Sequence, residues 1–105
     1  MMISSVLAVS LMVAAQLPAA PQRSQFANCL RAFMNEKLEA RMAVPEFETA
    51  VAAACREQES AYRTAYVAAA IRTGDPRPRA ESDSNVEVED LRTNFLELFR
   101  GSQPE

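Results

Sequence analysis

The chain has 105 residues, of which 11 are basic and 14 acidic, giving a formal net charge of −3. This mild charge favours neither nucleic-acid binding nor binding to a membrane surface. The chain contains no histidine and only two cysteines, which excludes His-dependent zinc sites, four-cysteine clusters and the usual Ser-His and Cys-His nucleophile pairs. The two glycines form no phosphate-binding loop. We therefore expect a protein that is not an enzyme and has no metal or cofactor.

Residues 1–20 predict an export signal. They carry no charged side chain and include the apolar run VLAVSLMVAA at residues 6–15. This run has the length of a signal-peptide core and is too short to span a bilayer, which needs ~20 residues. Val13 and Ala15 place small residues at the two positions that a signal peptidase reads. Cleavage after Ala15 fits this pattern, and the mature chain then starts near Gln16.

Two alternatives stay open for this segment. One is a cut near Ala19 or Ala20, and the other is an uncleaved membrane anchor, because no Lys or Arg precedes the apolar run. With a signal peptide at residues 1–20, residues 21–105 form one small domain that is periplasmic or secreted and has no membrane contact after cleavage. Such an oxidising location favours a disulfide between the two cysteines.

An apolar stripe predicts the first helix, from about Ser24 to Met42. Ser24 is a suitable N-cap residue. The apolar side chains recur every three or four positions, as one face of a helix requires. They are Phe26, Cys29, Leu30, Phe33, Met34 and Leu38.

The second predicted helix runs without interruption from Pro45 to Arg72. Proline fits the first helical position, where its missing N–H is not needed. Gly74 and the prolines that follow end the helix, because glycine adopts the left-handed conformation readily and proline blocks continuation. The apolar stripe of this helix comprises Phe47, Val51, Cys55, Tyr62 and Tyr66.

The third predicted helix begins at Ser84, after a linker over residues 74–80, and stops at Gly101. Ser84 and Glu87 match the capping box, in which two side chains satisfy main-chain N–H groups of the first turn. The apolar stripe comprises Val88, Leu91, Phe95, Leu98 and Phe99. No run alternates like a strand, so the sequence predicts an all-α fold.

The two cysteines are placed for a direct disulfide. Cys29 lies thirteen residues before Met42, near the first turn, and Cys55 lies thirteen residues after it. In an antiparallel hairpin, equal distances from the turn bring two residues to the same height, here without a bend in the backbone. The sequence therefore predicts a disulfide-stapled helical hairpin with a third packed helix. Two free buried thiols are the alternative.

The second predicted helix is longer than the first, so its far end needs a cover. We expect the third helix to supply it, with Leu91, Phe95 and Leu98 meeting a face made of Ala61, Tyr62, Ala65, Tyr66 and Ala69. The alternative is that this alanine-rich face joins two copies of the chain. The oligomeric state is accordingly predicted as a monomer or a weak homodimer.

The strongest local charge pattern is acidic. Residues 81–90 carry five acids and no base. One interpretation is a surface for a basic protein partner, and the other is a set of acids that stabilise the positive end of a helix. The candidate partner surface combines these acids with two aromatic residues: Tyr62, Tyr66, Glu81, Asp83, Glu87, Glu89 and Asp90.

Three short motifs follow the export signal: F-A-N-C-L, P-E-F-E and A-A-C. Their order resembles the layout of short exported alphaproteobacterial proteins of unknown function. The resemblance covers the first two predicted helices and implies export and a disulfide, with no activity or binding residues. It rests on Phe26, Cys29, Leu30, Pro45, Glu46, Phe47, Glu48, Ala54 and Cys55.

Two functions fit these features. The first is a small exported protein-binding module of the adaptor, inhibitor or immunity type. The second is a periplasmic stress or chaperone-like protein. Because the disulfide does not hold the third helix, we expect this helix to detach first. Low pH would favour its detachment, since protonation of its acids removes their interaction with the helix dipole. A chaperone-like protein could use the apolar surface that this exposes.

Overall fold

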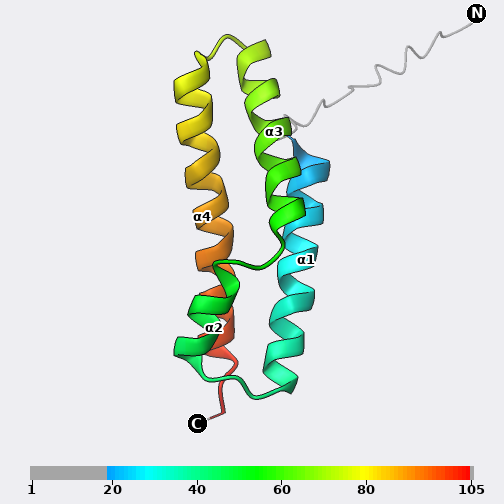
Figure 1. The fold of residues 1–105 in the computed structure, drawn as a ribbon, viewed down its shortest axis with the longest axis vertical. Helices are drawn as coiled ribbons and strands as arrows, with labels where there is room; N and C mark the ends of the chain where they lie inside the picture. Colours follow the sequence, from blue (N-terminus) through cyan, green and yellow to red (C-terminus); the bar gives the residue numbers. More distant parts are fainter. Residues whose placement is uncertain (1–18, 105) are drawn as a thin grey trace, which may run out of the picture.

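The computed structural model describes residues 19–104, and all regular structure in this range is helical. The helices are α1 (Ala20–Glu39), α2 (Val44–Val51), α3 (Arg56–Arg72) and α4 (Arg77–Gly101). In Figure 1, α1 and α4 run in one direction and α2 and α3 in the other. The predicted signal peptide falls almost wholly on residues 1–18, which lie outside the described part. None of the helices between residues 19 and 104 combines the length and the hydropathy that a membrane-spanning segment needs.

The all-α prediction and the disulfide are confirmed. Cys29 and Cys55 are bonded, with their Cα atoms 6.1 Å apart. The first helix starts earlier than predicted, at Ala20, and ends at Glu39. Pro21 is tolerated in its first turn, where no helical N–H bond is lost.

The prediction of one continuous helix from Pro45 to Arg72 is wrong. The segment forms two helices: α2 ends at Val51 and α3 begins at Arg56. Cys55 adopts a left-handed conformation, with φ 60° and ψ 42°. This conformation costs a residue with a side chain roughly 1–2 kcal/mol. The alanine-rich sequence favours a helix here, so contacts elsewhere in the fold hold the break.

The last helix also begins earlier than predicted. It starts at Arg77, with Pro76 as N-cap and Pro78 in the first turn. The capping box at Ser84 is therefore wrong, because Ser84 lies inside α4 and its hydroxyl donates to the carbonyl of Glu81 at 2.8 Å. The prolines that the pattern assigned to a linker instead begin the helix, where proline's fixed φ is suitable.

The expected end of the long segment at Gly74 is confirmed. Gly74 has a φ of 104°. Its N–H donates to Ile71 O at 3.1 Å, and the N–H of Asp75 donates to Ala70 O at 3.0 Å. These two bonds form the Schellman motif that ends many helices.

The core lies where all four helices meet. Phe47 of α2 stacks on Phe99 of α4, with ring centroids 3.9 Å apart and planes 5° apart. On α4 the predicted stripe is buried except Leu98, which is 47% exposed. The buried cluster comprises Phe26, Leu30, Met34, Phe47, Val51, Tyr62, Val88, Leu91, Phe95 and Phe99.

The early start of α4 shifts its register on the other helices. Its first half packs along α3, where Arg63 donates to Asn85 and Tyr62 donates to Glu87. Its second half packs on α2 through Phe99. The expected meeting of Leu98 with the alanine-rich face therefore does not occur. Ala61 stays exposed, and Ala70 is buried in place of the predicted alanines.

The α3–α4 hairpin extends past the beginning of α1 (Figure 1). Cys29 and Cys55 lie at one level, and Ala20 is nine residues from Cys29. Because α1 and α3 have the same rise per residue, α1 begins level with about residue 64 of α3. We call residues 65–83, which lie beyond this level, the free end.

Candidate functional site

The structure divides the seven predicted surface residues among four places. Tyr62 lies in the core, with 2% of its surface exposed. Its hydroxyl donates to the Glu87 carboxylate at 3.4 Å. Its ring lies edge-on to Tyr66, with centroids 6.1 Å apart. Tyr62 therefore packs beneath Tyr66 and is too buried to contact a partner protein.

The second place is the half-buried Tyr66, together with the carboxylates whose charges act on its hydroxyl. Burial raises the pKa of Tyr66, and the negative charges of Asp83, Glu87 and Asp75 raise it further. We call these four residues the Tyr66 face. Asp90 follows Glu87 by three positions and lies on the same side of α4, farther from the free end.

Glu81 and Glu89 lie apart from the Tyr66 face and from each other. Glu81 lines a groove of about 530 Å³ between α3 and α4. Glu89 lines a smaller hollow of about 220 Å³ between α2 and α4. The five acids are thus not one surface, because a helix with 3.6 residues per turn distributes positions 81–90 around its axis.

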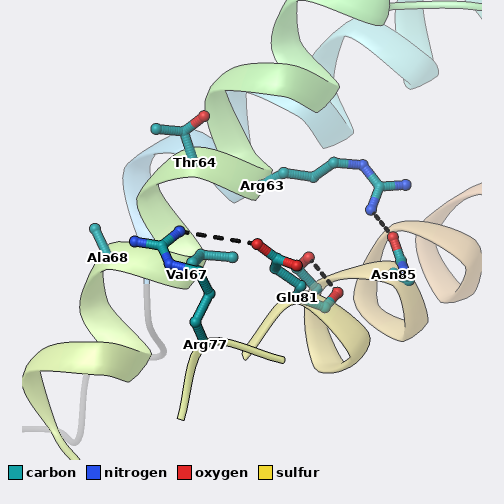
Figure 2. Close-up of a pocket in the computed structure, with 8 residues that line it drawn as sticks. Arg63, Thr64, Val67, Ala68, Arg77, Glu81 and Asn85 are labelled. Atoms are coloured by element: carbon teal, nitrogen blue, oxygen red, sulfur yellow. Dashed lines mark hydrogen bonds and ion pairs between the residues drawn. The ribbon is translucent and has the colours of Figure 1, made fainter. Parts of the chain in front are cut away.

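The α3–α4 groove is lined by polar and apolar side chains alike, and its charged groups are paired (Figure 2). Arg77 forms an ion pair with Glu81 at 3.8 Å. Arg63 donates to Asn85 and to Glu59, the latter at 3.2 Å. The remaining lining residues are Thr64, Val67, Ala68 and Ser84. The sequence pattern did not predict this groove, because it assigned residues 74–80 to a linker. The first turns of α4, which form one wall of the groove, were therefore not expected to be helical.

The most connected polar residue is Arg92, which the sequence pattern did not single out. It lies on the buried face of α4, 6% exposed. Its guanidinium donates to the carbonyl oxygen of Val51 and, at 2.9 Å, to that of Ala54. It also forms an ion pair with Glu59. At the end of α2 the Val51 carbonyl accepts only a long main-chain bond, 3.4 Å from the N–H of Ala54. Arg92 gives this carbonyl and that of Ala54 a further donor at the break.

Glu59 is the acid that this arrangement perturbs. Burial raises its pKa, but hydrogen bonds from Arg92 and Arg63, together with their positive charges, outweigh burial and lower the pKa below its usual value. Glu59 is therefore ionised in the folded protein. Its position in the first turn of α3 also suits the helix dipole.

Tyr62 is perturbed in the opposite sense. Burial, followed by the negative charge of Glu87, raises the pKa of Tyr62 to about 12. The phenol is therefore neutral at physiological pH and donates a hydrogen bond to the Glu87 carboxylate. This bond ties α3 to α4 directly beneath Tyr66.

Among residues 19–104, no three His, Cys, Asp or Glu side chains are grouped closely enough to hold a metal ion. The groups that the structure does assemble are an aromatic hydroxyl, carboxylates and paired arginines, which are suited to polar recognition. Comparisons with protein-family models, curated proteins and solved structures gave no match to this chain.

Proposed function

We propose that this chain is a small exported protein-binding module that uses the Tyr66 face to contact a basic segment of another protein. The observation that supports this most directly is the position of Tyr66. It lies half-buried on the free end, and the negative charges of three carboxylates act on its hydroxyl. Tyrosine is common at protein interfaces because it combines a large apolar ring with a polar group.

The negative charge of the Tyr66 face indicates a basic partner. Asp75, Asp83 and Glu87 give the Tyr66 face a negative potential, and Arg79 is the base that pairs with Asp83, at 4.0 Å. An exposed pair at this distance contributes little and is easily exchanged. A lysine- or arginine-rich segment would be attracted to such a face and oriented by it.

The disulfide supports export. Intramolecular disulfides persist in the periplasm and outside the cell, and are rare in the cytosol. The uncharged apolar run at residues 6–15 and the resemblance to short exported proteins point the same way. We therefore place the mature chain in the periplasm or outside the cell.

The experiment compares two variants with the same charge change on the same helix. Asp83→Lys reverses a charge of the Tyr66 face, and Glu97→Lys reverses an exposed acid that pairs with Arg100 at the other end of α4. Tagged wild type and both variants are crosslinked in the source cells, and each captured protein is quantified. A partner of this face is retained by the wild type and by Glu97→Lys and is lost from Asp83→Lys.

Two results would contradict the proposal. If no captured protein distinguishes Asp83→Lys from Glu97→Lys, then the Tyr66 face binds no protein. If many unfolded proteins are captured equally by all three forms, then the chaperone-like function is favoured. The trigger expected for that second function has lost its basis, because residues 81–90 lie inside α4 and not at its beginning.

A further inference from the structure

The break between α2 and α3 has a sequence that favours a helix. Residues 52–55 are Ala-Ala-Ala-Cys, and alanine has the highest helix propensity of all residues. Neither glycine nor proline is present in these four residues. Cys55 nevertheless has a φ of 60°, which residues with a side chain rarely adopt. Local preference and the folded conformation therefore oppose each other here.

Two contacts from other helices hold this conformation. The first is the bond from Cys29 of α1 to Cys55 itself. The second is the guanidinium of Arg92 from α4, which binds the carbonyls of Val51 and Ala54 on either side of the turn. The disulfide is covalent and joins Cys55, the residue with the unfavourable conformation. Its reduction should therefore change the free-energy difference between the broken and the continuous helix more than loss of the Arg92 hydrogen bonds.

The same segment has a second reasonable conformation. As one helix over residues 44–72, Phe47, Val51 and Cys55 would continue the apolar stripe of Tyr62 and Tyr66 at helical spacing. In that helix the carbonyls near the break bond to main-chain N–H groups and do not need Arg92. Phe47 cannot then keep its stack on Phe99, because α2 would follow the axis of α3.

We propose that residues 52–55 are a redox-controlled conformational switch. With the Cys29–Cys55 disulfide intact, the segment is broken and α2 packs on α4. With two free thiols, residues 44–72 form a single helix and Phe47 leaves Phe99. In rare proteins, two packings of one sequence differ by only a few kcal/mol. A covalent bond that is present in only one of the two packings can then decide between them.

The chemical step is thiol–disulfide exchange with a dithiol. A thiolate of the dithiol attacks the sulfur of one cysteine, the Cys29–Cys55 bond breaks, and a mixed disulfide forms. The second thiol of the reductant then closes its own disulfide. Cys29 and Cys55 gain two electrons and two protons, and the reductant loses them. Both cysteines are half-buried, so a small dithiol can reach the bond.

The test uses the full-length mature chain and two matched variants without the disulfide. Cys29→Ala/Cys55→Ala favours the single helix, and Cys29→Ala/Cys55→Gly favours the break, because glycine accepts the left-handed conformation. The readouts are the ¹³Cα shifts of residues 52–55, the contact between the rings of Phe47 and Phe99 by nuclear Overhauser effect, and the melting temperature. Oxidised wild type and wild type in dithiothreitol are measured in parallel.

The proposal expects helical shifts at all four positions of the break in the Ala/Ala variant and in reduced wild type, and loss of the Phe47–Phe99 contact. The Ala/Ala variant should melt above the Ala/Gly variant, because glycine destabilises a helix interior. Three results would overturn the proposal. They are non-helical shifts with the ring contact retained, a higher melting temperature for Ala/Gly, and unfolding of all forms that lack the disulfide.

Discussion

The guanidinium of Arg92 on α4 and the carboxylate of Glu59 on α3 form an ion pair that is shielded from solvent, with 7% and 14% of their side chains exposed. The same guanidinium donates to two carbonyls next to the break and lies 5.1 Å from the ring centroid of Phe26 on α1. One side chain thus contacts α1, α3 and the end of α2. Its removal should affect the whole domain.

We expect Arg92→Met to lower the free energy of unfolding by about 3 kcal/mol. Glu59 then keeps only its pair with Arg63, and the carbonyls of Val51 and Ala54 lose a buried donor. Arg100→Met is the matched control, since Arg100 is an exposed arginine of the same helix. It should change stability by less than about 1 kcal/mol. Urea unfolding of both variants and of Glu59→Gln measures the difference. Equal effects of the two arginine variants would contradict the role given to Arg92.

The lowered pKa of Glu59 predicts acid sensitivity. A carboxyl whose pKa is lower in the folded state than in the unfolded state contributes stability above the unfolded pKa, near 4.5, and loses it as the pH falls through the folded pKa. The free energy of unfolding of the wild type should therefore decrease below about pH 4.5. Glu59→Gln removes this part of the decrease, which urea unfolding at a series of pH values would detect. An identical pH profile for both proteins would contradict the assignment.

The sequence was sufficient for some elements because the signals were local. The stripe of α1 from Phe26 to Leu38 and the end of α3 at Gly74 follow from spacing and from one residue's backbone preference. The Cys29–Cys55 bond was also predicted, although by a geometric argument that assumed a straight second helix. In the structure the two cysteines meet with Cys55 in a left-handed turn.

The remaining features depend on contacts between distant segments. Nothing in the alanine-rich sequence around Ala52 marks a break, because the break depends on two distant residues. Cys29 lies 26 positions before Cys55, and Arg92 lies 37 positions after it. The prolines at 76 and 78 fit both a linker and the beginning of a helix. In the structure they begin α4, whose first turns bury Ala80 against the rest of the fold. The residues of the predicted partner surface do not lie together, because residues 81–90 are helical and a helix places neighbouring acids on different sides.

The two tyrosines should titrate late. The chain has two tyrosines and no tryptophan, so absorbance near 295 nm reports them alone. The pKa of Tyr62 is raised to about 12 and that of Tyr66 is raised above its usual value of 10. We expect less than half of the tyrosinate signal at pH 10 in the folded protein, and the full signal only at higher pH or after unfolding. Tyr62→Phe should remove the later of the two transitions.

Phe99 and Leu98 provide a matched pair of neighbouring positions. Phe99 is fully buried on the ring of Phe47, whereas Leu98 is 47% exposed. Phe99→Ala should cost about 3–5 kcal/mol of folding free energy, as aromatic deletions in cores do. Leu98→Ala should cost well under about 1 kcal/mol, because the residue is on the surface. Similar losses of stability at both positions, measured by thermal unfolding, would contradict the assignment of Phe99 to the buried face of α4 and of Leu98 to its exposed face.

The order in which the helices open can be predicted from their anchoring. The sequence led us to expect the last helix to detach first, because neither cysteine lies in it. In the structure α4 packs against the other three helices and has seven buried residues, whereas α2 has eight residues in all and buries two, Phe47 and Val51. Short elements with few buried contacts open at a lower free energy than well-packed ones. We therefore expect the amides of α2 to exchange before those of α4 at neutral pH. Hydrogen exchange resolved by residue would show this order, and protection of α2 equal to that of the central turns of α4 would contradict it.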